Sequence, residues 1–181
     1  MIPRLSERYK KEIIPAMQEK FHMDNAMAVI RLEKIVVNMG VGEAIDDPKI
    51  LEKAAEELAM ITGQKPIIRR AKLAISNFKL KAGQAVGCKV TLRQAKMYEF
   101  MDRLINVALP RIRDFNGVSR RAFDREGNYT LGLNEQTIFP EVELDRISKA
   151  QGMDITFVFN HGPKEQTLEL LSLFGMPFAK S

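Results

Sequence analysis

The chain has 181 residues with ordinary globular proportions, 45% hydrophobic and 28% charged, which predicts one compact domain over residues 1–181 and argues against wholesale disorder. No apolar run approaches the roughly 20 residues of a membrane-spanning helix, and the charged N-terminus lacks the apolar segment of a secretory signal, so we expect a cytoplasmic protein with no membrane partner. The net charge is +5, and Cys88 and two histidines are the only residues of their kinds, so the sequence predicts no internal disulfide, no metal site and no cofactor.

Periodicity in the first part of the chain predicts a helix, a strand and a second helix. Residues 1–20 show the spacing of a basic amphipathic helix that Pro15 bends or ends. The β-branched segment 29–39 is typical of a strand. A helix follows, with Asp47 as its N-cap, Pro48 at its first position and Gly63 directly after its last turn.

Two strands joined by a long loop are predicted next. The strands cover residues 66–73 and 87–93, and the extended loop between them covers residues 74–86. Alternation along the second strand predicts one apolar face and one polar face, because successive side chains of a strand point to opposite sides. The polar face carries Lys89, Thr91 and Arg93.

The remaining elements complete a mixed α and β pattern. Helices are predicted over 95–108 and 163–174, strands over 129–133 and 154–160, and an extended polar loop over 114–128. Phe157 and Phe159 share a strand face and are predicted to lie in the core. Because strict βαβ alternation is missing, we predict the α+β class: a single, mainly antiparallel sheet with helices packed on one face and the other face open.

Basic residues concentrate between Leu58 and Tyr98. This stretch contains nine of the 28 Lys and Arg residues and none of the 23 acidic ones. The nine are Lys65, Arg69, Arg70, Lys72, Lys79, Lys81, Lys89, Arg93 and Lys96. Basic character gathered in one region is a stronger indication of a nucleic-acid partner than net charge alone.

The predicted strand pair would place several of these basic residues on one surface. Arg70 and Lys72 share a face of the first strand, and Lys89, Thr91 and Arg93 share a face of the second. If the two strands pair, they form a basic surface without an acid. Lys and Arg bind phosphates through charge, and a hydroxyl can bond phosphate or ribose oxygens, so the pattern favours folded RNA. An ordinary solvent-exposed sheet face is the alternative.

The loop between these strands is a second candidate. It carries Asn77, Phe78, Lys79 and Lys81. An aromatic ring among lysines can stack on a base. A single loop phenylalanine more often folds back onto the core, and we expect that here.

Enzymatic interpretations find little support. Gly40-Val41-Gly42 follows a strand and precedes a helix, but a dinucleotide-binding loop needs a third glycine where this chain has Ile45. Asp46 and Asp47 would repel a pyrophosphate. They could hold Mg²⁺ in a nuclease, although adjacent acids at a helix start are usually caps. No nucleophile, base and oxyanion site come together, so no catalytic residue is predicted.

Seven runs along the chain closely resemble the bacterial ribosomal protein L five family. They are VVNMGVGEA (36–44), TGQKP (62–66), GCKVTLR (87–93), LPRIRDFNG (109–117), GNYTLGL (127–133), EQTIFPE (135–141) and GMDITF (152–157). The resemblance implies a non-enzymatic constituent of the large ribosomal subunit that binds 5S ribosomal RNA in the central protuberance. Large-subunit ribosomal RNA and other central-protuberance proteins are further implied partners.

The resemblance also implies a 5S RNA site. In the family, polar residues of the first three runs meet the RNA backbone, and the matching residues here are Asn38, Gln64 and Thr91. Together with the basic face, the expected site is Asn38, Gln64, Arg70, Lys72, Lys89, Thr91 and Arg93.

Two loops have implied roles of their own. The loop at 76–84 resembles the family element that approaches the peptidyl-site tRNA. The loop at 115–129 resembles the part that forms an intersubunit bridge with a small-subunit head protein. The expected bridge residues are Asn116, Val118, Arg120 and Arg121. An alternative function is protein–protein bridging through this loop, with RNA binding incidental.

Overall fold

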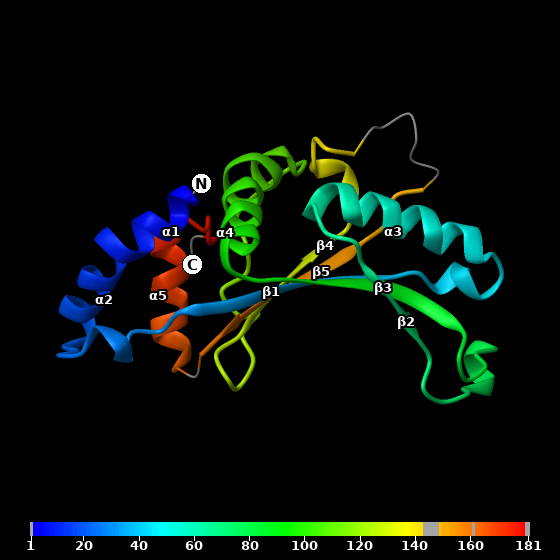
Figure 1. Ribbon diagram of the computed structural model, residues 1–181, viewed down its shortest axis with the longest axis horizontal. Helices are drawn as coiled ribbons and strands as arrows, with labels where there is room; N and C mark the ends of the chain where they lie inside the picture. The colour runs from blue at the N-terminus through cyan, green and yellow to red at the C-terminus, as the bar shows by residue number, and fades with distance from the viewer. Residues whose placement is uncertain (1, 143–148, 161, 180–181) are drawn as a thin grey trace. The chain divides into compact units, whose positions relative to one another are not determined.

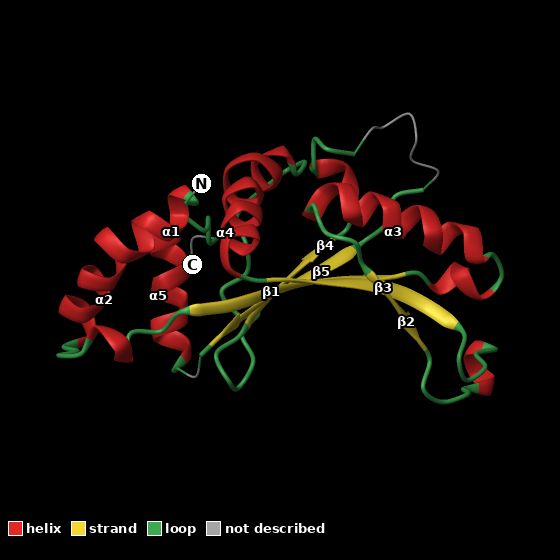
Figure 2. Cartoon of the chain, viewed as in Figure 1, coloured by secondary structure: helices red, strands yellow, loops and turns green. Residues whose placement is uncertain are grey.

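The computed structural model describes residues 2–142, 149–160 and 162–179 and contains a five-stranded sheet with the strand order β2-β3-β1-β5-β4 (Figure 2). The strands are β1 (Leu32–Gly40), β2 (Ile67–Arg70), β3 (Ala85–Leu92), β4 (Tyr129–Leu133) and β5 (Met153–Phe159). The helices are α1 (Arg4–Arg8), α2 (Ile14–Phe21), α3 (Pro48–Thr62), α4 (Gln94–Arg103) and α5 (Lys164–Phe174). The predicted α+β class and its antiparallel sheet are confirmed.

The chain forms two compact units. The first contains Met1–Ile35, Leu92–Leu131 and Thr156–Ser181, and the second contains Val36–Thr91 and Gly132–Ile155. All strands of the sheet except β2 contribute residues to both units.

In the second unit, α3 has the caps that the sequence predicts. The Asp47 carboxylate accepts a hydrogen bond from the Lys49 N–H at 3.0 Å, and Gly63 ends the helix with a φ of 64°. A left-handed residue after the last turn favours glycine, because it has no Cβ to strain. The helix lies along the strands of its unit (Figure 1) and buries Leu51, Ala54, Leu58 and Ile61.

Alternate residues of β1 and β3 differ in burial. The buried side chains of these strands in the second unit are Val37, Met39, Cys88 and Val90. Their neighbours Val36, Asn38, Lys89 and Thr91 are only partly buried. One face is therefore covered and the other open, as the alternation predicts.

In the first unit, the predicted N-terminal helix continues past Pro15. α1 leads into a π-helical turn at Tyr9–Ile13, and Pro15 lies in the first turn of α2. Proline cannot donate to the carbonyl four residues earlier, and a wider turn directly before it relieves that conflict. Pro15 therefore does not end the helix.

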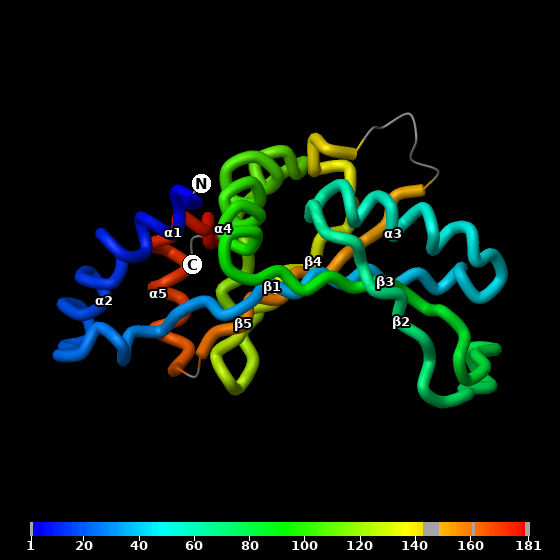
Figure 3. Tube along the Cα trace, viewed as in Figure 1, coloured from blue at the N-terminus to red at the C-terminus, as the bar shows by residue number. Residues whose placement is uncertain are grey.

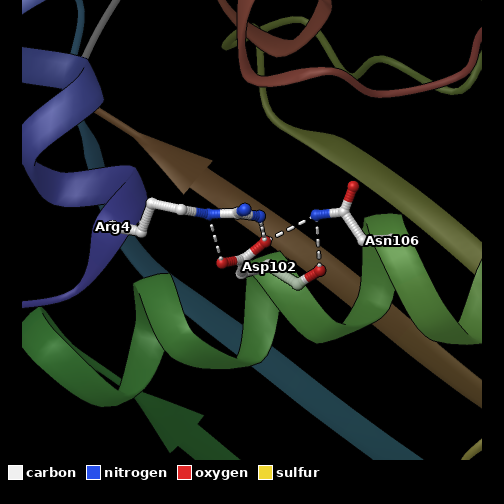
Figure 4. A network of polar contacts seen from close by, with 3 residues as sticks. All are labelled: Arg4, Asp102 and Asn106. Atoms are coloured by element: carbon white, nitrogen blue, oxygen red, sulfur yellow. Dashed lines mark hydrogen bonds and ion pairs between the residues drawn. The ribbon is translucent and has the colours of Figure 1, made fainter.

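A polar contact joins α1 to α4 in the first unit (Figure 4). The Arg4 guanidinium donates to both carboxylate oxygens of Asp102, at 2.6 and 3.2 Å. The Asn106 side-chain amide donates to the same carboxylate at 2.5 Å and to the Asp102 carbonyl at 3.0 Å. Asp102 thus binds Arg4 of α1 and Asn106, which lies in the helical turn directly after α4.

The remaining predicted elements are present, and the ends of some of them are shifted. The predicted strand at 129–133 matches β4, and Phe157 and Phe159 of β5 are core residues, 0% and 5% exposed. The predicted helix at 95–108 is α4 followed by a π-helical turn at Leu104–Ala108. The predicted helix at 163–174 is α5, and Gly175 ends it with a φ of 98°.

Candidate nucleic-acid interface

The TGQKP run ends α3 and aims Gln64 at β3. The Thr62 hydroxyl donates to the Leu58 carbonyl at 2.7 Å and to the Gln64 carbonyl at 3.2 Å, while Gly63 turns the chain in the left-handed conformation. The Gln64 amide then donates to the Thr91 carbonyl at 3.1 Å. Two residues that the family resemblance singles out are therefore hydrogen-bonded to one another.

The β2–β3 register shows which basic residue lies beside Lys89. Ile67 pairs with Lys89 and Arg69 pairs with Gly87, so alternation puts Arg69 on the face of Lys89. A register shift follows between Arg69 and Arg70. Arg69, which the expected site omitted, therefore continues this face, and the sequence could not reveal the strand register that decides it.

Arg70 and Lys72 do not form the face that the sequence predicts. The register shift separates Arg70 from the regular pairing that aligns Arg69 with Lys89, and the Arg70 guanidinium donates to the Gly83 carbonyl at 3.0 Å. Lys72 is exposed but lies beyond the end of β2, which is shorter than the predicted strand at 66–73.

β1 brings Asn38 to the same face. The Val41 N–H donates to the Val86 carbonyl at 2.9 Å, which aligns β1 with β3. Counting back along the antiparallel strands from this pair, we infer that Asn38 lies across from Lys89. We call Asn38, Gln64, Arg69, Lys89 and Thr91 the polar face.

An acid also reaches the open side of the sheet. Asp154 alternates with buried residues of β5, and its carboxylate lies 3.6 Å from where a Cβ on Gly132 of β4 would stand. The expectation of a basic surface without an acid concerned β2 and β3 alone, and neither strand contains an acid; Asp154 adds a carboxylate from β5. Within the described residues, no ion pair is recorded for Arg69 or Lys89.

Arg93 lies outside the polar face. β3 ends at Leu92 rather than at the predicted residue 93, and Arg93 is the exposed N-cap position of α4. It belongs to the first unit.

The loop between β2 and β3, whose course Figure 3 shows, is organised by its own hydrogen bonds. At its base, the Ala71 N–H donates to the Gln84 carbonyl at 2.8 Å, and the Gly83 N–H donates to the Ala71 carbonyl at 2.9 Å. Nearer its tip, Ile75 and Leu80 exchange backbone hydrogen bonds of 2.9 and 3.1 Å. The loop therefore presents a defined tip.

Phe78 stands at this tip and is 70% exposed. The expectation that it folds back onto the core is wrong. The Ser76–Phe78 turn closes onto Lys79, whose φ is 53°, so the tip is completed before the ring can reach the core. Asn77, Lys79 and Lys81 are exposed beside it.

The loop at 114–128 is anchored through Val118. The side chain of Val118 is 4% exposed, and its N–H donates to the Pro177 carbonyl at 2.8 Å. Asn116, Arg120 and Arg121 are exposed. A partner at this loop would therefore meet the amide and the two guanidinium groups, while Val118 holds the loop in place.

The far end of this loop closes around Asp124. One carboxylate oxygen accepts from the N–H groups of Glu126 and Asn128 at 3.0 and 2.7 Å, and the other accepts from the Asn128 side-chain amide at 2.8 Å. The Phe123 and Tyr129 rings pack with centroids 4.8 Å apart. These contacts give the turn around Asp124 a defined conformation.

The described residues give no support to the nuclease interpretation. They contain no group of three or more His, Cys, Asp and Glu side chains that could hold a metal ion. Asp47 caps α3 through its side chain, and Asp46 is exposed beside it.

None of the helices described is long and apolar enough to cross a membrane.

Known proteins match this chain along its length. The family model described as Ribosomal protein L5 matches residues 25–81, and the ribosomal L5P family C-terminus matches residues 85–178. The Large ribosomal subunit protein uL5 of Clostridium kluyveri is 59% identical over 98% of this chain and 98% of its own length. The proteins of that name from Clostridium acetobutylicum and Clostridium perfringens are 57% and 56% identical over 99% and 98% of this chain, and over 100% and 99% of their own lengths. This chain belongs to the ribosomal protein L5 family.

Proposed function

We propose that this protein is a structural, non-enzymatic constituent of the large ribosomal subunit in the cytoplasm, where its polar face binds 5S ribosomal RNA in the central protuberance. The observation that carries the proposal is the convergence of Gln64, Thr91 and Lys89 on one open side of the second unit. They come from two runs of the family pattern: Gln64 from residues 62–66, and Lys89 and Thr91 from residues 87–93. Large-subunit ribosomal RNA and neighbouring proteins of the protuberance complete its surroundings.

Charged groups of the polar face supply affinity for RNA, and its uncharged groups determine how the RNA is positioned. Arg69 and Lys89 neutralise phosphates and release their counterions, which gives affinity that falls as salt rises. Gln64 uses one N–H for the Thr91 carbonyl, so its second N–H and its oxygen remain to meet RNA in a fixed orientation. The Thr91 hydroxyl can donate or accept. Such oriented groups determine the register of a folded RNA on the protein.

The tip of the loop at 76–84 is the proposed contact with the peptidyl-site tRNA. Phe78 is exposed and has Asn77, Lys79 and Lys81 around it. An exposed ring stacks on a base or sugar, and lysines attract phosphates. Phe78→Ala should weaken contact with tRNA in assembled subunits and leave the stability of the protein unchanged.

The loop at 114–128 is the proposed bridge to a protein of the small-subunit head. Its exposed Arg120 and Arg121 suit an acidic protein surface as well as RNA. This observation keeps the alternative function open, in which bridging is the main role and RNA binding is incidental. The double variant Arg120→Ser/Arg121→Ser separates the two: under the proposed function it retains full affinity for 5S RNA.

Hydroxyl-radical footprinting of refolded 5S RNA tests the proposal. The full chain should protect a defined set of riboses, and Lys89→Ala should lose part of that protection. Arg120→Ser/Arg121→Ser should keep all of it. Loss of protection with the loop variant, and not with Lys89→Ala, would place the RNA on the loop and contradict the proposal.

A further inference from the structure

A pocket of about 290 Å³ opens in the first unit. Pro3 and Leu32 are buried residues in its lining, and the rings of Tyr9 and Tyr98 contribute aromatic surface. Its size is near the lower end of the ~300–1,000 Å³ of ligand pockets. It therefore suits one ring system and a short polar attachment.

The two tyrosine rings are fixed in place. The Tyr9 hydroxyl donates to the Ile30 carbonyl at 3.0 Å, and its ring stacks on Phe174 with centroids 6.0 Å apart and planes at 16°. Tyr98 packs against the same Phe174 ring at 6.2 Å. Aromatic surface that is already ordered binds a flat ring without a further loss of side-chain freedom.

The pocket is positively charged. Lys10 and Arg31 are exposed in its lining, which contains no acidic residue. The acids of the neighbouring helical segment are engaged elsewhere: Glu7 with Lys11 at 3.5 Å, and Glu12 with Arg8 at 3.2 Å. An anionic group is therefore attracted to the side of the pocket where Lys10 and Arg31 lie.

We propose that this pocket holds one unstacked nucleotide of ribosomal RNA, with the base against the tyrosine rings and the phosphate at Lys10 and Arg31. The proposal rests on the role in the ribosome proposed above and adds a contact separate from the polar face. Unpaired bases of folded RNA are recognised by aromatic stacking together with charged and hydrogen-bonding groups. Gln94 also lines the pocket, and its amide can hydrogen-bond a base edge. An acidic peptide would use the cations and leave the aromatic surface unfilled.

Photo-cross-linking of the full chain to a single-stranded hexanucleotide of 5-iodouridine tests the proposal, because the iodinated base cross-links to aromatic rings against which it stacks. Peptide mapping should find the cross-link on Tyr9 or Tyr98. Lys10→Ala/Arg31→Ala should weaken hexanucleotide binding roughly tenfold, since each substitution removes a charge-assisted contact. Arg111→Ala/Arg113→Ala removes the same charge from exposed residues of the first unit outside the pocket and should change binding less than about twofold.

Three results would contradict the proposal that this pocket binds a nucleotide. They are a cross-link confined to Phe78, an equal loss in both double variants, and displacement of the RNA by a hexa-aspartate peptide more effectively than by unlabelled hexanucleotide. The affinity of Thr91→Val for 5S RNA, measured in parallel, tests the polar face independently of the pocket. The failure of this proposal can therefore be told apart from the failure of the proposed function. A cross-link at Tyr98 with normal 5S binding by Thr91→Val would support the pocket and contradict the polar face.

Discussion

The side-chain amide of Gln64 donates a hydrogen bond to the main-chain carbonyl of Thr91 at 3.1 Å. Backbone pairing of β2 with β3 begins at Ile67 and Lys89, so the amide supplies β3 with a donor just before β2 begins. This hydrogen bond thereby connects the end of α3 to the polar face. A change at Gln64 should therefore affect both folding and RNA binding.

Gln64→Ala should lower the free energy of unfolding by about 1 kcal/mol, the typical net value of one hydrogen bond. Its affinity for 5S RNA should fall as well, because the oriented amide is lost. Chemical denaturation and equilibrium binding measure the two effects. Gln64→Glu should be worse in both, since a carboxylate would face the Thr91 carbonyl and the RNA phosphates. Unchanged stability of Gln64→Ala would show that the hydrogen bond does not stabilise the fold.

Lys89→Ala should reduce the salt dependence of 5S RNA binding. The slope of log K against log salt should become shallower by roughly 0.7–0.9, the loss of one phosphate contact. Lys53→Ala is the matched control, because Lys53 is an exposed residue of α3, the helix on the covered side of the sheet. Binding measured across a salt series gives both slopes. Equal changes in the two variants would mean that net charge, and not position, determines affinity.

Gly87→Ala should destabilise the second unit. A Cβ at this position would lie 2.5 Å from the Met39 carbonyl oxygen, so the backbone of β1 would have to move. The expected loss is ~1–3 kcal/mol, as for other overpacked sites. Gly42→Ala is the control, because a Cβ there meets nothing within 4 Å. Thermal or chemical unfolding should separate the two variants, and similar stabilities would rule out the close approach.

Cys88 should make stability depend on alkaline pH. Burial, and secondarily the charge of Glu57, raises the pKa of its thiol from 9.0 to about 11. Between these values the folded protein keeps a proton that the unfolded chain releases, so this contribution is complete below pH 9 and declines as pH rises to 11. Cys88→Ala should remove it from a pH series of unfolding curves. The native thiol should react slowly with a disulfide reagent at pH 8, and fast labelling of folded protein would contradict its burial.

Local patterns predicted much of the fold. Asp47, Pro48 and Gly63 mark the ends of α3 because caps depend on residues within one turn. Alternation placed Lys89 and Thr91 together on the less buried side of β3, because it depends only on the pleat of one strand.

Features that depend on contacts between distant parts of the chain could not be predicted from the sequence. The Gln64–Thr91 contact and the register shift after Arg69 require the pairing of separate elements. Asp154 joins the open side of the sheet from a strand far along the chain. Phe78 is exposed because its loop closes on its own hydrogen bonds, a geometry that composition does not encode.

The affinity of Thr91→Val for refolded 5S RNA at fixed salt tests the polar face most directly. Valine nearly matches threonine in shape, so the substitution removes the hydroxyl and little else. Thr137→Val, which also removes a hydroxyl in the second unit, is the control. We predict about fivefold to tenfold weaker binding for Thr91→Val, the effect of one lost hydrogen bond, with unchanged unfolding and normal binding by the control. Equal affinity of Thr91→Val and the unsubstituted protein would contradict the assignment of Thr91 to the RNA interface.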